Sequence, residues 1–165
     1  MNQLTLFNKK LVVFDAMVLI NFHGLYAFDK LTTWTHGELV LESKIIKVEA
    51  NYSKAGEIDY EQYIAGGAII EKVLETEEHQ TLFSYYLNKK IKGTTINKGE
   101  AACLALAISE NFGMASDEFA VRYEFKRKYP NNVCIHSWGI VDMAVNLKFI
   151  SKREGEDLKR GFYYV

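Results

Sequence analysis

One short stretch, residues 11–22, constrains the fold of this chain more than any other. It reads LVVFDAMVLINF, and Asp15 is its only charged residue. Leu11–Phe14 are strand-forming residues in a continuous apolar run, which indicates a β-strand buried on both faces. Met17–Phe22 indicates the start of a helix that packs back over this strand. We therefore expect Asp15 at the carboxyl end of a central strand, where a carboxylate is costly to ionise unless a positive partner meets it.

Similar short apolar runs alternate with helical patterns after a lead-in at residues 1–10. Further strands are predicted at residues 39–41, 68–70, 113–116 and 133–136, and helices at residues 43–53, 57–65, 76–87, 98–110, 118–129, 138–147 and after Ser151. The predicted N-caps are Ser43, Thr76, Asn97, Ser137 and Ser151. This alternation predicts a three-layer α/β/α sandwich with a central, mostly parallel sheet. A chain of 165 residues suits one such domain, residues 1–165.

Composition and charge exclude several other classes of protein. The net charge of −1 means that no basic field over the whole molecule marks a nucleic-acid binder. The longest apolar runs are too short to span a membrane, and the N-terminus lacks the pattern of a signal peptide, so a cytoplasmic protein is expected. Cys103 and Cys134 lie far apart in apolar stretches, which predicts reduced core cysteines rather than a disulfide or a zinc site.

Two further acidic residues fall on the apolar faces of predicted helices, and one more ends a strand. Glu49 shares a face with Ile46, and Glu100 shares a row with Leu104. Asp117 follows the predicted strand 113–116, and ligands of parallel sheets gather at such strand ends. Each acid also has an ordinary explanation. Glu100 can complete a capping box with Asn97, Asp117 can cap the helix behind it, Glu49 can pair with a lysine, and Asp15 can accept backbone amides.

Charge repulsion favours a common role for Asp15, Glu49, Glu100 and Asp117. Carboxylates that lie close together cannot all ionise cheaply, and a divalent cation removes that penalty. Hard oxygen ligands suit Mg²⁺ or Mn²⁺ rather than Zn²⁺. The four histidines, at positions 23, 36, 79 and 136, show no ligand spacing. A metal site built from the four acids is therefore the predicted chemistry.

The ordered motifs resemble the PIN-domain family. They comprise a strand ending in Asp15, the pattern Ser43-x-x-Ile46-x-x-Glu49 after a short strand, Gly99-Glu100-Ala101 at the start of an alanine-rich helix, and Ser116-Asp117-Glu118 after another strand. Their order and spacing agree over nearly the whole chain. The resemblance implies a metal-dependent ribonuclease with Asp15, Glu49, Glu100 and Asp117 as metal ligands and catalytic residues. It further implies an RNA substrate, an antitoxin protein in the case of a toxin–antitoxin pair, and a homodimer.

Two positions depart from the family pattern. Ala16-Met17 follows the first aspartate, where the family often has a small hydroxyl or amide residue. Glu118 stands where the family has a second aspartate, and it is interpreted as a first-turn helix residue in preference to a peripheral ligand.

The expected mechanism is attack of a metal-activated water on the phosphodiester, with Asp15 as the central ligand and Asp117 or Glu100 orienting the water.

Basic residues near the predicted site are candidate phosphate contacts, with Lys98 and Arg122 in the best positions. Solvated charge alone explains most such residues equally well. An alternative reading, favoured by Ala16-Met17, is a PIN-like module that has lost catalysis and binds RNA or a protein partner. A haloacid-dehalogenase phosphatase is a poor fit because Met17 stands where a second aspartate is needed. A dinucleotide-binding fold is a poor fit too, because no G-x-G-x-x-G follows the first strand.

Overall fold

The molecule is built on five parallel strands in the order β5-β2-β1-β8-β9. The computed structural model describes residues 4–162, so residues 1–3 of the expected lead-in and residues 163–165 of the expected domain lie outside it. The strands are β1 (Val12–Phe14), β2 (Leu39–Glu42), β5 (Ile69–Lys72), β8 (Gly113–Ala115) and β9 (Cys134–Ile135). The prediction of a central parallel sheet is confirmed.

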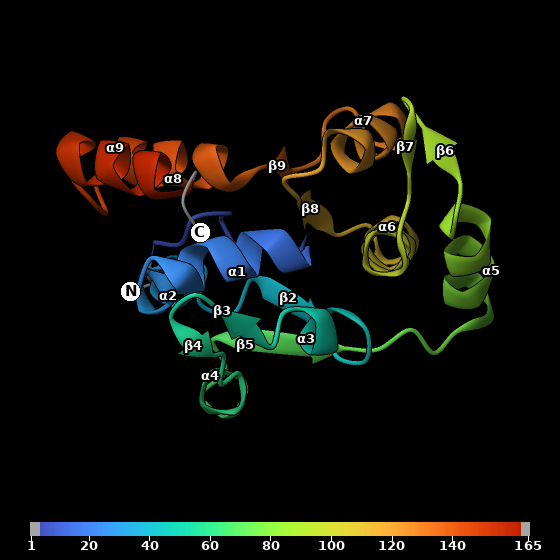
Figure 1. Cartoon of the computed structure of the whole chain (residues 1–165), viewed down its shortest axis with the longest axis horizontal. Coiled ribbons are helices and arrows are strands. Elements are labelled where there is room, and N and C mark those ends of the chain that lie inside the picture. The colour runs from blue at the N-terminus through green and yellow to red at the C-terminus, as the bar shows by residue number, and fades with distance from the viewer. Residues whose placement is uncertain (1–3, 163–165) are drawn as a thin grey trace.

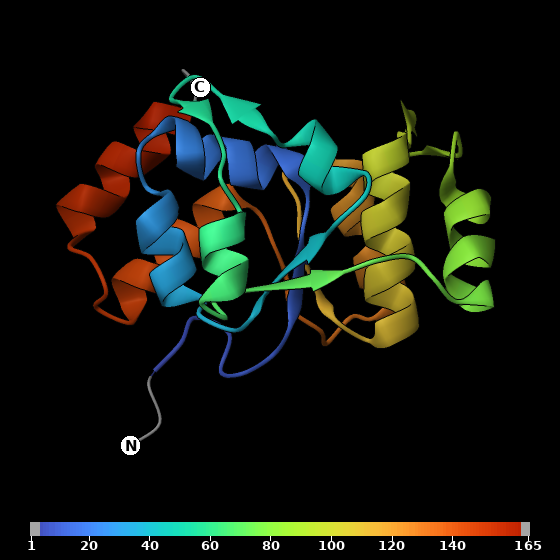
Figure 2. The ribbon, with the colours of Figure 1, turned by 90° about the horizontal axis from the view of Figure 1, so that it is seen from below.

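Helices cover both faces of this sheet (Figures 1 and 2). One side carries α1 (Ala16–Gly24), α2 (Phe28–Trp34), α8 (Ser137–Asn146) and α9 (Lys152–Gly161), and the other carries α5 (Glu77–Tyr86), α6 (Lys98–Glu110) and α7 (Phe119–Lys128). The short helices α3 (Ile46–Glu49) and α4 (Glu61–Ala65) lie between β2 and β5 in the chain. The predicted α/β/α sandwich is therefore confirmed. Within residues 4–162, no helix combines the length and apolar character that crossing a membrane requires.

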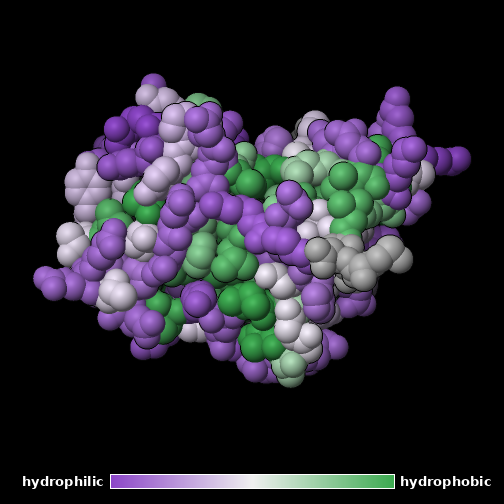
Figure 3. All heavy atoms as spheres, turned by 180° about the vertical axis from the view of Figure 1, so that it is seen from behind, coloured by the Kyte–Doolittle hydropathy of each residue, from purple (hydrophilic) through white to green (hydrophobic). Residues whose placement is uncertain are grey.

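The core is packed between the sheet and these two helical layers. All three residues of β1 and all four of β2 are buried, as expected for strands covered on both faces. In α6, every residue from Gly99 to Ala107 is buried, so this helix is enclosed on all sides. On the surface seen in Figure 3, apolar side chains gather in patches separated by hydrophilic ones. The exposed apolar side chains on that face therefore form separate small patches and not one continuous apolar surface.

The predicted helix over residues 43–53 was largely wrong. Only Ile46–Glu49 is helical, and the chain then enters a hairpin of β3 (Tyr52–Ser53) and β4 (Gly56–Glu57). Ser43 is not the cap. Instead the buried Glu42 carboxylate accepts hydrogen bonds from the backbone amides of Lys44, Ile45 and Ile46, at 2.7–2.9 Å. A side chain at the end of the preceding strand thus satisfies the first amides of α3.

Other local predictions differ from the structure by a few residues. The helix predicted over 57–65 begins only at Glu61, and residues 89–95 form a hairpin of β6 (Lys90–Ile91) and β7 (Thr94–Thr95) rather than a plain loop. The cap of α8 is the His136 side chain, not Ser137, because the His136 ring accepts from the Gly139 amide. The predicted caps Thr76, Asn97 and Ser151 are confirmed.

The strand order places a crevice at one end of the sheet. From β1 the chain builds outward through β2 and β5 on one side, then returns to build β8 and β9 on the other. Ligands bind outside the carboxyl ends of the strands where the direction of winding reverses, here between β1 and β8. Figure 2 shows the beginnings of α1 and α6 and the helix α3 meeting at this end. Asp15 is the first residue after β1, and Asp117 is the second residue after β8.

Candidate active site

A cleft of about 460 Å³ opens at this reversal point. Five acidic residues line it, namely Asp15, Glu49, Glu100, Asp117 and Glu118. They come from the ends of β1 and β8, from α3 and from the first turn of α6. The structure thus brings all four of the sequence-predicted acids, and the neighbouring Glu118, to the rim and walls of one hollow.

Asp15 lies at the bottom of this arrangement and is held on both carboxylate oxygens. Its Oδ1 accepts from the Ala16 amide at 2.8 Å, and its Oδ2 accepts from the Ser116 hydroxyl at 2.9 Å. Its backbone amide donates to the Ala115 carbonyl, which extends the pairing of β1 with β8 by one residue. Asp15 is only 6% exposed. Its position is therefore determined by the sheet and by one buried serine.

The electrostatic surroundings of Asp15 oppose its ionisation. Burial raises the pKa of Asp15 to about 6, and the charges of Glu100 and Glu49 push it in the same direction. The hydrogen bonds from Ser116 and from the Ala16 amide partly offset this rise. A carboxylate that is buried beside two other acids carries unbalanced negative charge at neutral pH.

Glu49 ends the one-turn helix α3 and reaches toward the start of α6. Partial burial raises the pKa of Glu49, Glu42 adds to that rise, and the Gly99 amide and the Lys98 charge oppose it. Gly99 is essential to this approach, since a Cβ added there would lie 2.2 Å from Glu49 Oε2. The prediction that Glu49 lies on a buried apolar helix face was wrong, because Glu49 is exposed where it lines the cleft.

Glu100 has two roles in the structure. It completes the capping box of α6, because its Oε1 accepts from the Asn97 amide at 2.9 Å while its own amide donates to Asn97 Oδ1 at 2.8 Å. It also faces the cleft, where burial raises its pKa and the charges of Glu118 and Glu49 raise it further. The capping explanation and the site explanation are therefore compatible.

Asp117 differs from the other acids because both of its carboxylate oxygens accept hydrogen bonds from α1 and from the start of α8. Its Oδ2 accepts from Asn21 Nδ2 at 2.7 Å and from the Ser137 hydroxyl at 2.6 Å, and its Oδ1 accepts from the Ser137 amide at 2.7 Å. It joins β8 to α1 and to the first residue of α8. Asp117 does not cap α7, since Glu118 is the N-cap of that helix, one residue before its first turn.

Four carboxyl groups form an electrostatically coupled set. Asp15, Glu49, Glu100 and Glu118 are connected by charge effects on the pKa values of Asp15 and Glu100, and Asp117 is not among the causes of either shift. Their oxygens are the hard ligands that Mg²⁺ and Mn²⁺ prefer, so the donor set fits these ions in chemistry and charge. As the side chains stand, no group of three or more His, Cys, Asp or Glu residues within 4–162 is arranged to hold a metal ion.

Several residues that shape the cleft had no site role assigned from the sequence, although Ser116 and Gly99 stood in its motifs. Ser116 bridges the site, donating to Asp15 and accepting from the Glu118 amide at 3.2 Å. Asn21 and Ser137 hold Asp117, and Gly99 admits Glu49. Ser116 and Gly99 lie directly beside predicted acids in the sequence, a signal that could have suggested their roles. Asn21 and Ser137 act across 96 and 20 residues, and no local pattern indicates such pairs.

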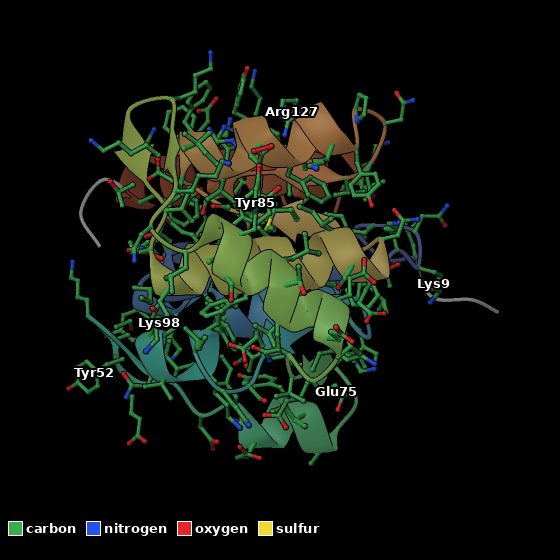
Figure 4. All side chains as sticks on the ribbon, turned by 90° about the vertical axis from the view of Figure 1, so that its right-hand side faces the viewer. Lys9, Tyr52, Glu75, Tyr85, Lys98 and Arg127 are labelled. Atoms are coloured by element: carbon green, nitrogen blue, oxygen red, sulfur yellow. The ribbon has the colours of Figure 1, made fainter. Side chains whose placement is uncertain are left out.

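The two predicted phosphate contacts come from different helices, and neither lines the cleft. Lys98 is at the first residue of α6, close enough to Glu49 to oppose the rise of its pKa, and Figure 4 shows it beside α3 at one edge of the molecule. Arg122 is on α7, where its Nη1 donates to the Ser116 carbonyl at 2.9 Å. Tyr85 on α5 and Arg127 on α7 lie away from Lys98 in the same view (Figure 4).

Neither a protein-family model, nor a curated protein, nor a solved structure matches this chain. The geometry and charge of the cleft are therefore the basis for assigning a function.

Proposed function

We propose that the protein is a Mg²⁺- or Mn²⁺-dependent ribonuclease of the PIN type, acting at the acidic cleft. The observation that carries this proposal is the convergence of Asp15, Glu49, Glu100 and Glu118 on one hollow at the reversal point of the sheet, with Asp15 raised to a pKa of about 6. Glu100 and Glu118 also cap α6 and α7, but the approach of four acids to one another costs electrostatic free energy that these caps do not require. A cation that neutralises them explains the arrangement.

Each residue then has a defined task. Asp15, oriented by Ser116 and the Ala16 amide, would be the central ligand, and Glu49 and Glu100 would supply further oxygens from α3 and α6. Asp117 holds the rim in place through Asn21 and Ser137, while Glu118 takes the peripheral position. A divalent ion bound among them supplies a water of lowered pKa and offsets charge on the leaving oxygen of the phosphodiester.

The direct test is cleavage of a mixed pool of single-stranded RNA with Mn²⁺, with Mg²⁺ and with chelator alone. Wild-type protein is expected to cleave only with metal, and Asp15→Asn, Glu49→Gln and Glu100→Gln are expected to lose at least about 100-fold of that activity. Asp59→Asn and Glu57→Gln, which alter exposed acids outside the cleft, are the matched controls. Equal activity in wild type and Asp15→Asn, or none at millimolar metal, rejects the proposal.

A second candidate function is a PIN-like module that binds RNA or a protein partner without cleaving. Two observations favour it. Met17 and Ala16 line the cleft where a polar residue would assist a metal-bound water, and Asp117 is occupied by three hydrogen bonds. If this is the function, Mn²⁺ produces no RNA cleavage, yet the protein still binds RNA or a protein partner.

The PIN resemblance also supports proposals on the biological setting. A cytoplasmic toxin, neutralised by an antitoxin protein and acting as a homodimer, is the setting we propose. Inspection of the adjacent reading frame tests the antitoxin, and light scattering tests the dimer.

A further inference from the structure

A second groove, of about 590 Å³, lies between α7 and the segment from β9 to the start of α8. These elements pack against each other at one side of the molecule (Figure 1). The groove is separated from the acidic cleft by a smaller hollow of about 340 Å³. Asn21 and Asp117 line both the cleft and that hollow, and His136 lines both the hollow and the groove. The three depressions thus lie next to one another in a row, which is called the track below.

The groove is positively charged on its α7 side. Arg122, Lys126 and Arg127 line it. Arg127 is paired with the buried Glu124, but the contact of Arg122 is with a neutral carbonyl, so its charge is not cancelled by that bond. The charges of Arg122 and Lys126 reach the groove floor, because they oppose the rise in pKa that burial produces in Cys134. The track therefore passes from negative at the cleft to positive at the groove.

Exposed aromatic rings border the same groove. Phe119 and Tyr123 stand one helical turn apart on α7, with ring centroids 6.2 Å apart, and are 59% and 38% exposed. The Lys92 ammonium, from the β6–β7 hairpin, lies 4.4 Å from the Tyr123 ring centre. Trp138, 39% exposed, lines the smaller hollow. Large aromatic side chains exposed beside basic groups are typical of surfaces that stack unpaired bases.

His136 adds a hydrogen-bond donor at the junction. Its Nδ1 accepts from the Gly139 amide at 3.1 Å, so the neutral ring must carry its proton on Nε2. The capping bond thus fixes a tautomer that donates from Nε2 even without a positive charge. Phosphate oxygens accept from such a donor.

We propose that this groove binds the backbone and bases of single-stranded RNA next to the phosphodiester held at the acidic cleft. The assignment rests on the proposed ribonuclease function for the identity of the ligand. Arg122 and Lys126 contact phosphates, while Phe119 and Tyr123 stack on bases that a duplex would keep paired. The groove thereby makes a single strand, and not a helix, the substrate.

The test measures binding without cleavage. Fluorescence anisotropy of a labelled single-stranded RNA of about 12 nucleotides is followed in EDTA, between about 50 and 200 mM salt. Lys126→Ala is expected to weaken binding several-fold at low salt and to reduce the salt slope by about 1. Phe119→Ala is expected to weaken binding by roughly 5- to 100-fold, with little change in the salt slope. Lys30→Ala and Tyr26→Ala, exposed residues at α2 and the loop before it, are the matched controls.

The outcomes separate this inference from the proposed function. Binding by both groove variants equal to wild type, or binding of duplex RNA as tight as that of the single strand, overturns the groove assignment even if metal-dependent cleavage is found. Weakened binding by the groove variants supports the groove even if no metal produces cleavage, which rejects the ribonuclease alone. Retention of a protein partner by wild type and variants alike, with no RNA bound, also overturns it.

Discussion

At the scale of single residues, Asp15 combines the strongest structural constraint with the least favourable charge environment. It is buried, and both of its carboxylate oxygens accept hydrogen bonds. Burial raises its pKa from an ordinary 3.8 to about 6. Because the folded pKa is the higher one, the folded state binds more protons between these values. The free energy of unfolding of the metal-free protein therefore falls as the pH rises through this interval, and the whole penalty is present above it.

Asp15→Asn is accordingly expected to stabilise the metal-free protein at a pH of about 8, by on the order of 1–2 kcal/mol. The two-unit shift sets an upper limit of roughly 3 kcal/mol, and the altered contact with Ser116 removes part of it. At a pH of about 3.5 the wild-type carboxyl is neutral in the folded state and largely neutral in the unfolded state, so most of the advantage should vanish. Urea unfolding in EDTA measures both, with Asp59→Asn as control. A variant less stable than wild type at the higher pH contradicts the account.

Gly99 is the residue that lets Glu49 approach α6. In Gly99→Ala the new Cβ would fall 2.2 Å from Glu49 Oε2, so the Glu49 carboxylate must turn away from the Gly99 amide. Alanine is the better helix former by up to about 1 kcal/mol, so stability should be kept or slightly raised. Mn²⁺-dependent activity should nevertheless fall by about 10-fold or more, in the same direction as the larger loss expected for Glu49→Gln. A Gly99→Ala variant that keeps both its stability and its full Mn²⁺-dependent activity would count against a role for Glu49.

At the scale of elements, sequence reasoning succeeded where a helix carries its own signals. Helix α6 begins after Asn97 with a capping box and ends at Glu110, with the boundaries predicted. Helix α3 was overextended, because its start is determined by Glu42 from the preceding strand and its end by the hairpin that follows. Neither influence leaves a periodic pattern in residues 43–53. The hairpin at residues 90–95 was missed for the same reason.

Glu42 is expected to be the residue on which α3 depends. Its carboxylate, 1% exposed, accepts from three backbone amides, and Glu42→Ala leaves those amides without their partner. We expect a loss of about 2–4 kcal/mol of unfolding free energy, compared with less than about 0.5 kcal/mol for the exposed control Glu57→Ala. Chemical denaturation measures both. A loss no larger than that of the control would show that α3 is held by its apolar contacts alone.

At the scale of the whole molecule, the cleft is a product of strand order. The alternating pattern predicts the parallel sheet and puts Asp15 and Asp117 at strand ends, as the structure has them. It does not predict that β1 and β8 are neighbours, nor that the first residue of α8, Ser137, bonds Asp117. These depend on how the crossovers pack. The charge that raises the pKa of Glu100 is therefore that of Glu118 and not that of Asp117. This result of the packing could not be predicted from the sequence.

If the cleft binds a divalent cation, the stability of the entire fold must report it. A ligand present at 100 times its dissociation constant adds about 2.7 kcal/mol to the free energy of unfolding. For a protein of this size, that corresponds to a rise in Tm of roughly 5–10 °C. Mn²⁺ is expected to produce this rise in wild type and to lose most of it in Asp15→Asn and Gly99→Ala, as followed by thermal unfolding.

The same rise in Tm should depend on pH with a defined sign. Protonated carboxyls do not bind the ion, and burial raises the pKa of Asp15 to about 6, with the pKa values of Glu49 and Glu100 also raised. The Mn²⁺-induced rise should therefore be full at a pH of about 8 and shrink steadily as the pH falls through about 6. Exposed acids with ordinary pKa values would keep their affinity down to a pH of about 5. A rise that is unchanged between these pH values, or that persists in Asp15→Asn, would place the bound ion somewhere other than the cleft.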